Sequence, residues 1–380
     1  MKKNYWMMMW AVLTLVGSTY ANDLTEGFVT DTPKVQSMSQ LTFGPQGILF
    51  VGDSKGAAVF AIQVEEGKKS ANDQRFSLRN VESKIADLLG ASASDILIHD
   101  MVVSPQQNVY LAVSRGRAKV KTYNLWPNYV DDANILLKIT PQGKIEEVSL
   151  KNVKYAQIEL PNPVAADKKD RRGRSLRSDV ITDLAYANGM VYVAGLSNEE
   201  FASTFRKIPF PFKNKVSAST LEIYHGAHGR YETKSPIRAF VPYKLNGKPH
   251  ILASYTCTPL VTIPEDKIEP GKHVKGRTIA ELGAGNMPLD MIVVNKNGQD
   301  YILMANTTRN VMKIAIKDIE NTKANLSTRT KIRYGSEGVN YVSVPRLVQQ
   351  MAVLNSKYIL MLMRMPDGSL ALSSMPIRRI

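Results

Sequence analysis

The sequence contains little cysteine, histidine and tryptophan. A single cysteine, Cys257, among 380 residues excludes an intramolecular disulfide framework and any CxxC zinc or redox motif. The five histidines form no HExxH pair. Hydrophobic residues make up 44% and charged residues 22% of the chain, so a large core is available and general disorder is excluded.

Acidic residues are also scarce relative to basic ones. The chain has 34 Asp and Glu against 49 Lys and Arg, which gives a formal net charge of +15. A basic surface attracts acidic proteins, anionic glycans, lipid phosphates or nucleic acid. Which of these applies depends on where the protein resides.

The first residues have the pattern of a secretory signal peptide. Lys2 and Lys3 precede an apolar stretch of 11 residues, 6–16, and the segment 18–21, Ser-Thr-Tyr-Ala, has small residues at 18, 19 and 21, where a signal peptidase reads them. We expect removal of residues 1–21, because 11 apolar residues are far fewer than the roughly 20 that span a bilayer. No later apolar run is long enough, so no transmembrane span is expected after cleavage. The predicted location is the bacterial periplasm, with secretion as the alternative, and nucleic acid is not an expected partner.

The body of the chain repeats one unit of three apolar strands. In the clearest copy the strands are 40–43, 48–52 and 57–62, separated by Gly-Pro-Gln-Gly and by a polar turn. A copy that begins at Asp290 matches it element for element. Further copies begin at Asp100, Asp183, Arg238 and Gln350. About six units of this kind predict an all-β protein, a single β-propeller over residues 22–380 with six four-stranded antiparallel blades.

Two alternatives remain at this stage. A seventh blade can be hidden in the long insertions, and alternating strands also fit a pair of β-sandwich domains. The strand pattern resembles that of exported six-bladed propellers of the NHL-repeat and gluconolactonase-like kind. The resemblance rests on that pattern, because the chain lacks the WD, kelch and quinoprotein signatures.

The first residues of the innermost strands are expected to form a ring around the central channel. They are Gln40, Asp100, Asp183, Arg238, Asp290 and Gln350. Three carboxylates on one ring repel one another unless a cation, an arginine or a basic ligand neutralises them. Asp100, Asp183 and Asp290 are therefore candidate ligands of a divalent cation. The alternative is that each polar residue caps its strand or binds the backbone of a neighbouring blade.

Turns between second and third strands should add a second layer to the same face. Arg115, Cys257 and Arg309 are its candidate ligand-binding residues. Cys257 is a candidate nucleophile, metal ligand or attachment point, or else a small buried apolar residue. His225 and His228, three residues apart, are a second candidate metal pair, with Glu232 as the nearest acid.

Two insertions, near 115–134 and 161–178, interrupt the repeat. Residues 168–177 hold six bases and one acid, which predicts a site for an acidic protein, a glycan or a lipid phosphate. A solvated loop is the alternative.

Three functions are compatible with these features. The first is an exported, non-catalytic propeller that binds a ligand or partner on its loop-bearing face. The resemblance implies a second, a metal-dependent lactonase or esterase in which channel carboxylates hold a divalent ion and His99 is the general base. A quinone-linked periplasmic dehydrogenase subunit is the third, based on export and charge alone.

Overall fold

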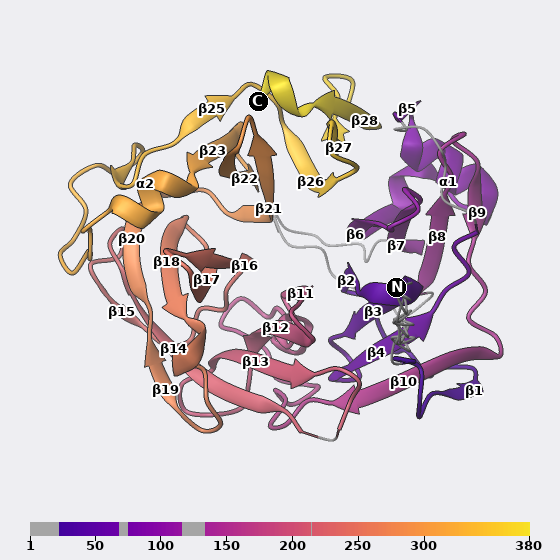
Figure 1. Cartoon of the computed structure of the whole chain (residues 1–380), viewed down its shortest axis with the longest axis horizontal. Helices are drawn as coiled ribbons and strands as arrows, with labels where there is room; N and C mark the ends of the chain where they lie inside the picture. Colours follow the sequence, from indigo (N-terminus) through magenta and orange to yellow (C-terminus); the bar gives the residue numbers. More distant parts are fainter. Residues whose placement is uncertain (1–22, 68–74, 116–133, 214) are drawn as a thin grey trace, which may run out of the picture.

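Six sheets stand in a ring in the computed structural model, which describes residues 23–67, 75–115, 134–213 and 215–380 (Figure 1). Each sheet is a blade whose innermost strand faces the centre, and blades are numbered here by the chain order of those strands. The protein is thus an all-β, six-bladed β-propeller with four-stranded antiparallel blades, as predicted, and not a pair of sandwiches. The predicted signal peptide and nearly all of the insertion at 115–134 lie outside the described residues.

The second half of the chain forms most of blades 4, 5 and 6. The strands of blade 4 are β16 (Ala239–Leu245), β17 (Lys248–Ser254), β18 (Pro259–Pro264), β20 (Arg277–Glu281) and β24 (Glu337–Gly338). Blade 5 consists of β21 (Pro288–Lys296), β22 (Gln299–Asn306), β23 (Val311–Ala315) and β25 (Val342–Val344). Blade 6 has β26 (Val348–Val353), β27 (Tyr358–Arg364), β28 (Leu370–Pro376) and β5 (Ser77–Arg79).

The first half of the chain forms the other three blades. Blade 1 contains β2 (Gln40–Phe43), β3 (Ile48–Asp53), β4 (Ala58–Gln63), β10 (Val153–Glu159) and β1 (Val29–Asp31). Blade 2 contains β6 (Ile96–Val103), β7 (Val109–Arg115), β8 (Ile135–Ile139) and β9 (Ile145–Glu147). Blade 3 contains β11 (Asp183–Ala187), β12 (Met190–Leu196), β13 (Ser203–Pro209), β14 (Ser217–His225), β15 (Arg230–Glu232) and β19 (His273–Lys275). Helices α1 (Val81–Leu89) and α2 (Ile316–Asn321) cover blade edges.

The order of the blades around the ring differs from their order in the chain. Strand β2 lies between β6 and β11, and β6 also lies beside β26, so the order is 2, 1, 3, 4, 5, 6 (Figure 1). After blade 2 the chain returns to blade 1, where β10 pairs with β4 and Tyr155 is opposite Ile62. Strand β5, which precedes blade 2, pairs with β28 of blade 6. These two pairings join distant parts of the chain and close the ring.

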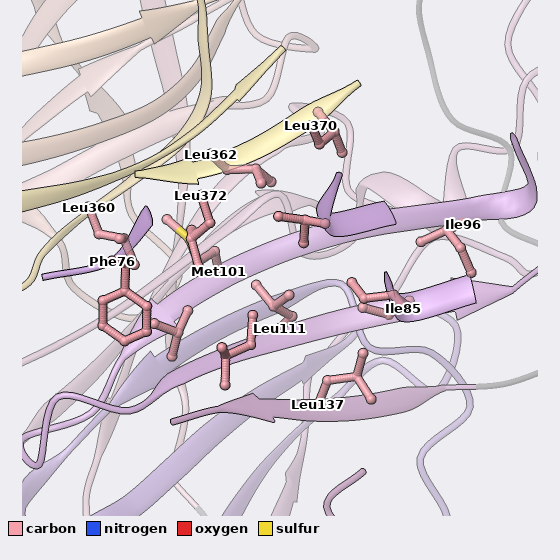
Figure 2. Close-up of a cluster of buried hydrophobic side chains, with 14 of the residues drawn as sticks. Phe76, Ile85, Ile96, Met101, Leu111, Leu137, Leu360, Leu362, Leu370 and Leu372 are labelled. Carbon is pink, nitrogen blue, oxygen red and sulfur yellow. The ribbon is translucent and has the colours of Figure 1, made fainter. Parts of the chain in front are cut away.

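The core consists of six apolar clusters, one between each pair of neighbouring blades in the described part of the chain. Both faces of a blade are therefore buried, and second strands such as β7 and β12 are almost continuously apolar, as doubly covered strands must be. Figure 2 shows the cluster between blades 2 and 6, where Leu111 and Leu137 face Leu360 and Leu372, with Ile85 from α1.

Loss of packing between two blades should destabilise the whole ring. Leu111 is 0% exposed in the cluster of Figure 2, so we expect Leu111→Ala to lower the free energy of unfolding by about 2–5 kcal/mol. Urea unfolding followed by circular dichroism measures this. The control is Leu88→Ala, because Leu88 on α1 is 46% exposed. Equal effects of the two substitutions would contradict the packing described here.

Candidate functional site

A central cavity of about 250 Å³ lies between the six innermost strands. Five of the six residues predicted for the ring line it: Gln40, Asp100, Asp183, Arg238 and Asp290. Most other lining residues are apolar, among them Val103, Leu289 and Val353. Gln350 does not line it, and its Nε2 instead donates to the carbonyl of His99 at 2.7 Å.

The three carboxyl groups come from alternate blades of the ring, namely 2, 3 and 5. Asp100 accepts hydrogen bonds from the backbone N–H of Leu41 in blade 1 at 2.6 Å and from that of Met101 at 2.8 Å. Asp183 likewise binds the N–H of Phe240 in blade 4, at 2.7 Å. Asp290 completes the set.

Asp290 binds the N–H of Met351 in blade 6 at 2.6 Å. The three carboxyl groups therefore join blades 2 and 1, blades 3 and 4, and blades 5 and 6. This is the alternative raised from the sequence, in which ring residues bind the backbone of a neighbouring blade. It gives the aspartates a structural role, and all three also line the cavity.

Burial deep in the channel is the largest influence on these carboxyl groups. It raises the pKa of Asp100 to about 8 and that of Asp290 to about 7, and it raises the pKa of Asp183 well above its usual range. The charge of Asp290 raises the pKa values of Asp100 and Asp183 further, whereas the backbone N–H donors lower them. The ring therefore retains protons up to near-neutral pH.

Removing one of these acceptors should weaken the joint between two blades. Asn in place of Asp183 keeps the shape but offers one acceptor atom instead of two, so one buried N–H loses its partner. We expect Asp183→Asn to destabilise the protein by about 1–3 kcal/mol, measured by urea unfolding at pH 6. Asp266→Asn is the matched control, since Asp266 is exposed. An unchanged urea midpoint in Asp183→Asn would show that Asp183 does not stabilise the contact between blades 3 and 4.

The raised pKa values also set a pH dependence. Between about pH 4 and pH 8 the folded ring holds protons that the unfolded chain releases, so the free energy of unfolding falls as pH rises. We expect Asp290→Asn to flatten this fall, mainly between pH 4 and pH 7, whereas Asp266→Asn leaves it unchanged. Thermal melts across this range measure the slope. If stability falls with pH as steeply in Asp290→Asn as in the unsubstituted protein, the raised pKa of Asp290 is contradicted.

Arg238 lies one residue before the position assigned to it in the ring. Strand β16 begins at Ala239, which pairs with Ser254 in the way that Asp183 pairs with Ala194, so Ala239 is the equivalent of the aspartates. The guanidinium of Arg238 forms an ion pair with Asp179, with N–O distances of 2.8 and 3.3 Å. Its charge is thus already balanced by an acid outside the ring.

His99 is held outside the cavity. A bulge between Ile98 and Asp100 interrupts the pairing of β6 with β7, and His99 Nε2 lies 2.9 Å from the hydroxyl of Ser114. Burial lowers the pKa of His99 to about 4, so the imidazole is neutral at neutral pH. His99 is not among the residues that line the cavity, and its predicted role as a general base has no geometric support.

Two arginines of the predicted second layer hold backbone carbonyls. Arg115 donates to Leu89 at 3.2 Å. Arg309 donates to the carbonyls of Leu282 at 2.7 Å and Ala284 at 3.2 Å. These contacts order the loops of this face.

The third member, Cys257, lies beside the predicted histidine pair. One nitrogen each of His225 and His228 and the sulfur of Cys257 lie within 4.8 Å of one another. Strand β14 of blade 3 ends at His225, and Cys257 occupies the turn between β17 and β18 of blade 4. Register places both at the face where the innermost strands begin. The sequence marked all three residues but not their proximity, because nothing in it shows that blades 3 and 4 place these turns together.

Glu232 binds both histidines. Its two oxygens lie 2.9 Å from His225 Nδ1 and 2.7 Å from His228 Nδ1, and Ser235 and Arg230 also donate to it. Burial acts to raise the pKa of Glu232, but the hydrogen bonds from the histidines outweigh it and hold that pKa well below its usual range. Glu232 is thus a charged acceptor behind the cluster.

The basic insertion at 161–178 is an ordered loop. Arg174 forms an ion pair with Asp170, and Arg177 donates to the carbonyls of Lys55 and Val164. The bases that remain exposed are Lys168, Lys169, Arg171 and Arg172. Part of the predicted charge therefore has a structural role, and four bases face solvent.

No protein-family model and no curated protein matches the chain. Solved structures that match include Drosophila plexin A in complex with semaphorin 1b, with 11% identity, 92% of this chain and 88% of that chain covered, and a TM-score of 0.38. Two structures of the plexin A4 extracellular region match at 9% identity and a TM-score of 0.36, over 92% of this chain and 40% and 51% of theirs. At these scores the likeness carries no functional argument. In the part of the chain that the structure describes, no helix is both long and apolar enough to cross a bilayer.

Proposed function

We propose that the protein is an exported binding protein that takes a small organic cation, a protonated amine with an apolar body, into its central cavity. The observation that carries this proposal is the lining of the cavity. Three carboxyl groups, those of Asp100, Asp183 and Asp290, face one space, and the single base among the lining residues, Arg238, is already paired with Asp179.

The charge of the ring is compatible with such a ligand. Raised pKa values mean that ionised aspartates are costly here, and a cation in the cavity would stabilise their ionised forms. Leu289, Ile292 and Val353 also line the cavity and offer apolar contacts to a hydrocarbon body, beside a lining surface that is mostly polar. Ligand pockets commonly combine apolar walls with a few convergent polar groups.

Export is the second part of the proposal and rests on the sequence at residues 1–21, with the periplasm as the proposed location. The exposed bases Lys168, Lys169, Arg171 and Arg172 remain a candidate contact for an acidic protein, a glycan or a lipid phosphate. The quinone-linked dehydrogenase stays a prediction that rests on charge and export alone.

A divalent cation at the same three aspartates is the competing occupant, and it would favour the metal-dependent hydrolase. Against it, both oxygens of Asp100 and of Asp183 already accept backbone N–H groups, and most other lining side chains are apolar, so the six to eight oxygen ligands that Ca²⁺ takes are not at hand. The organic cation needs only hydrogen bonds and charge.

Calorimetric titration of the chain without residues 1–21 distinguishes these occupants. The probes are butylamine and 1,4-diaminobutane, the uncharged butanol and 1,4-butanediol, and Ca²⁺. We expect the amines to bind and the alcohols not to, because a charge-assisted hydrogen bond contributes about 1.5–3 kcal/mol. Asp290→Asn should weaken amine binding roughly 10- to 100-fold.

Asp266→Asn, which changes the same charge at an exposed position, should bind like the unsubstituted protein. Circular dichroism confirms that Asp290→Asn is folded. The proposal is overturned if amines and alcohols bind equally well or if no amine binds. Ca²⁺ binding that is abolished by Asp290→Asn would instead identify the three aspartates as a metal site and favour the metal-dependent hydrolase.

A further inference from the structure

The most unusual group outside the central cavity is the imidazole of His225. Its side chain is 2% exposed, and its Nε2 is buried without a hydrogen-bond partner. A buried polar atom of this kind costs free energy unless something binds it. Its other nitrogen, Nδ1, is held by Glu232 at 2.9 Å, so the ring is fixed with Nε2 directed away from that carboxylate.

A second imidazole and a thiol lie beside this nitrogen. His228 is bound to the other oxygen of Glu232, the two rings lie 3.8 Å apart, and Cys257 Sγ completes a group of three possible ligands within 4.8 Å. Glu232 is ionised and can only accept, so both Nδ1 atoms donate to it, and in the neutral imidazoles both Nε2 atoms then present lone pairs. Metal-binding histidines typically donate their other N–H to a carboxylate in this way.

We propose that His225 Nε2, His228 Nε2 and Cys257 Sγ bind one late transition-metal ion, zinc or copper, with Glu232 orienting both histidines. Two imidazoles and one soft thiolate suit these ions and not Mg²⁺, Ca²⁺ or Mn²⁺, which prefer oxygen ligands. His228 is 41% exposed, so solvent reaches this side of the cluster.

The separations agree with such an ion. Metal–nitrogen and metal–sulfur bonds of about 2.0 and 2.3 Å at tetrahedral angles place ligand atoms about 3.3–3.6 Å apart. One nitrogen of each histidine and the sulfur of Cys257 lie within 4.8 Å of one another, so the ligand atoms need to approach by at most about 1.2–1.5 Å.

The backbone holds both turns in place. Gly226 N–H donates to Glu281 at 2.5 Å, and a side chain at Gly226 would meet Glu281 Cγ at 2.8 Å. In the other turn, Cys257 and Thr258 have φ values of 66° and 59°, a left-handed conformation that is strained for a β-branched threonine. The N–H of Cys257 donates to Asn286 at 2.7 Å. Strain of this kind is concentrated at binding sites.

The test is titration of the chelator-treated, untagged protein with Co²⁺ and with Cu²⁺, followed by absorption spectroscopy. A bound thiolate produces a sulfur-to-metal charge-transfer band, which a structural cysteine does not. We expect one ion per chain and this band, and we expect Cys257→Ser to lose the band and to weaken binding at least tenfold. Elemental analysis of the protein as purified from the exported fraction distinguishes zinc from copper.

Glu232→Gln should weaken binding about 10- to 100-fold while the charge-transfer band remains, because the amide can accept only one of the two N–H groups. His228→Ala should also weaken binding. Because the His228 side chain is 41% exposed, this variant should fold even if replacement of the buried His225 prevents folding. His250→Ala is the control, since His250 contacts the carbonyl of Lys248 in blade 4 and lies outside the cluster.

Asp290→Asn should leave metal binding intact, so the outcome here is independent of the proposal for the central cavity. Absence of the band with both ions, or a band and affinity in Cys257→Ser equal to those of the unsubstituted protein, would overturn the site. Binding of one Mg²⁺, Ca²⁺ or Mn²⁺ per chain that is lost when His225 or Cys257 is replaced would overturn the assignment to zinc or copper.

Discussion

The pairing of β10 with β4 is the interaction on which the rest of the structure depends. Through it the chain leaves blade 2, returns along the outer edge of blade 1 and enters blade 3 on the other side. Every blade is covered on both faces by a neighbour, and a ring of this kind is stable only when it is closed, because an open end would expose an apolar sheet face. Strand β5, paired with β28, adds a second tie to the last blade.

Closure of the ring also creates the polar features of the molecule. Once the blades stand side by side, the first residues of alternate innermost strands can reach the backbone of the next blade, and Asp100, Asp183 and Asp290 do so. The same joints place three carboxyl groups around one cavity. Stability and the proposed ligand binding thus depend on the same side chains, and the cost of burying them is visible in their raised pKa values.

Much of the fold was predictable because each blade is a local repeat. The strand 40–43 was predicted with the bounds of β2, and the copies at Asp183 and Asp290 lie within β11 and β21. The ring position of the aspartates followed from the same repeat. The error at Arg238 has a local cause: one residue separates Arg238 from the start of β16, and apolar alternation does not resolve a shift of one residue at a strand end.

The sequence by itself determined the all-β character, the number of blades and the residue types available for chemistry, because these depend on patterns within about 50 residues of chain. Only the tertiary structure decided which of those residues meet. His225 and Cys257 belong to different blades, and their approach depends on the order 3, 4 around the ring and on the lengths of two turns. The order 2, 1, 3 was likewise invisible in the sequence, because it depends on a pairing between strands that are about 90 residues apart in the chain.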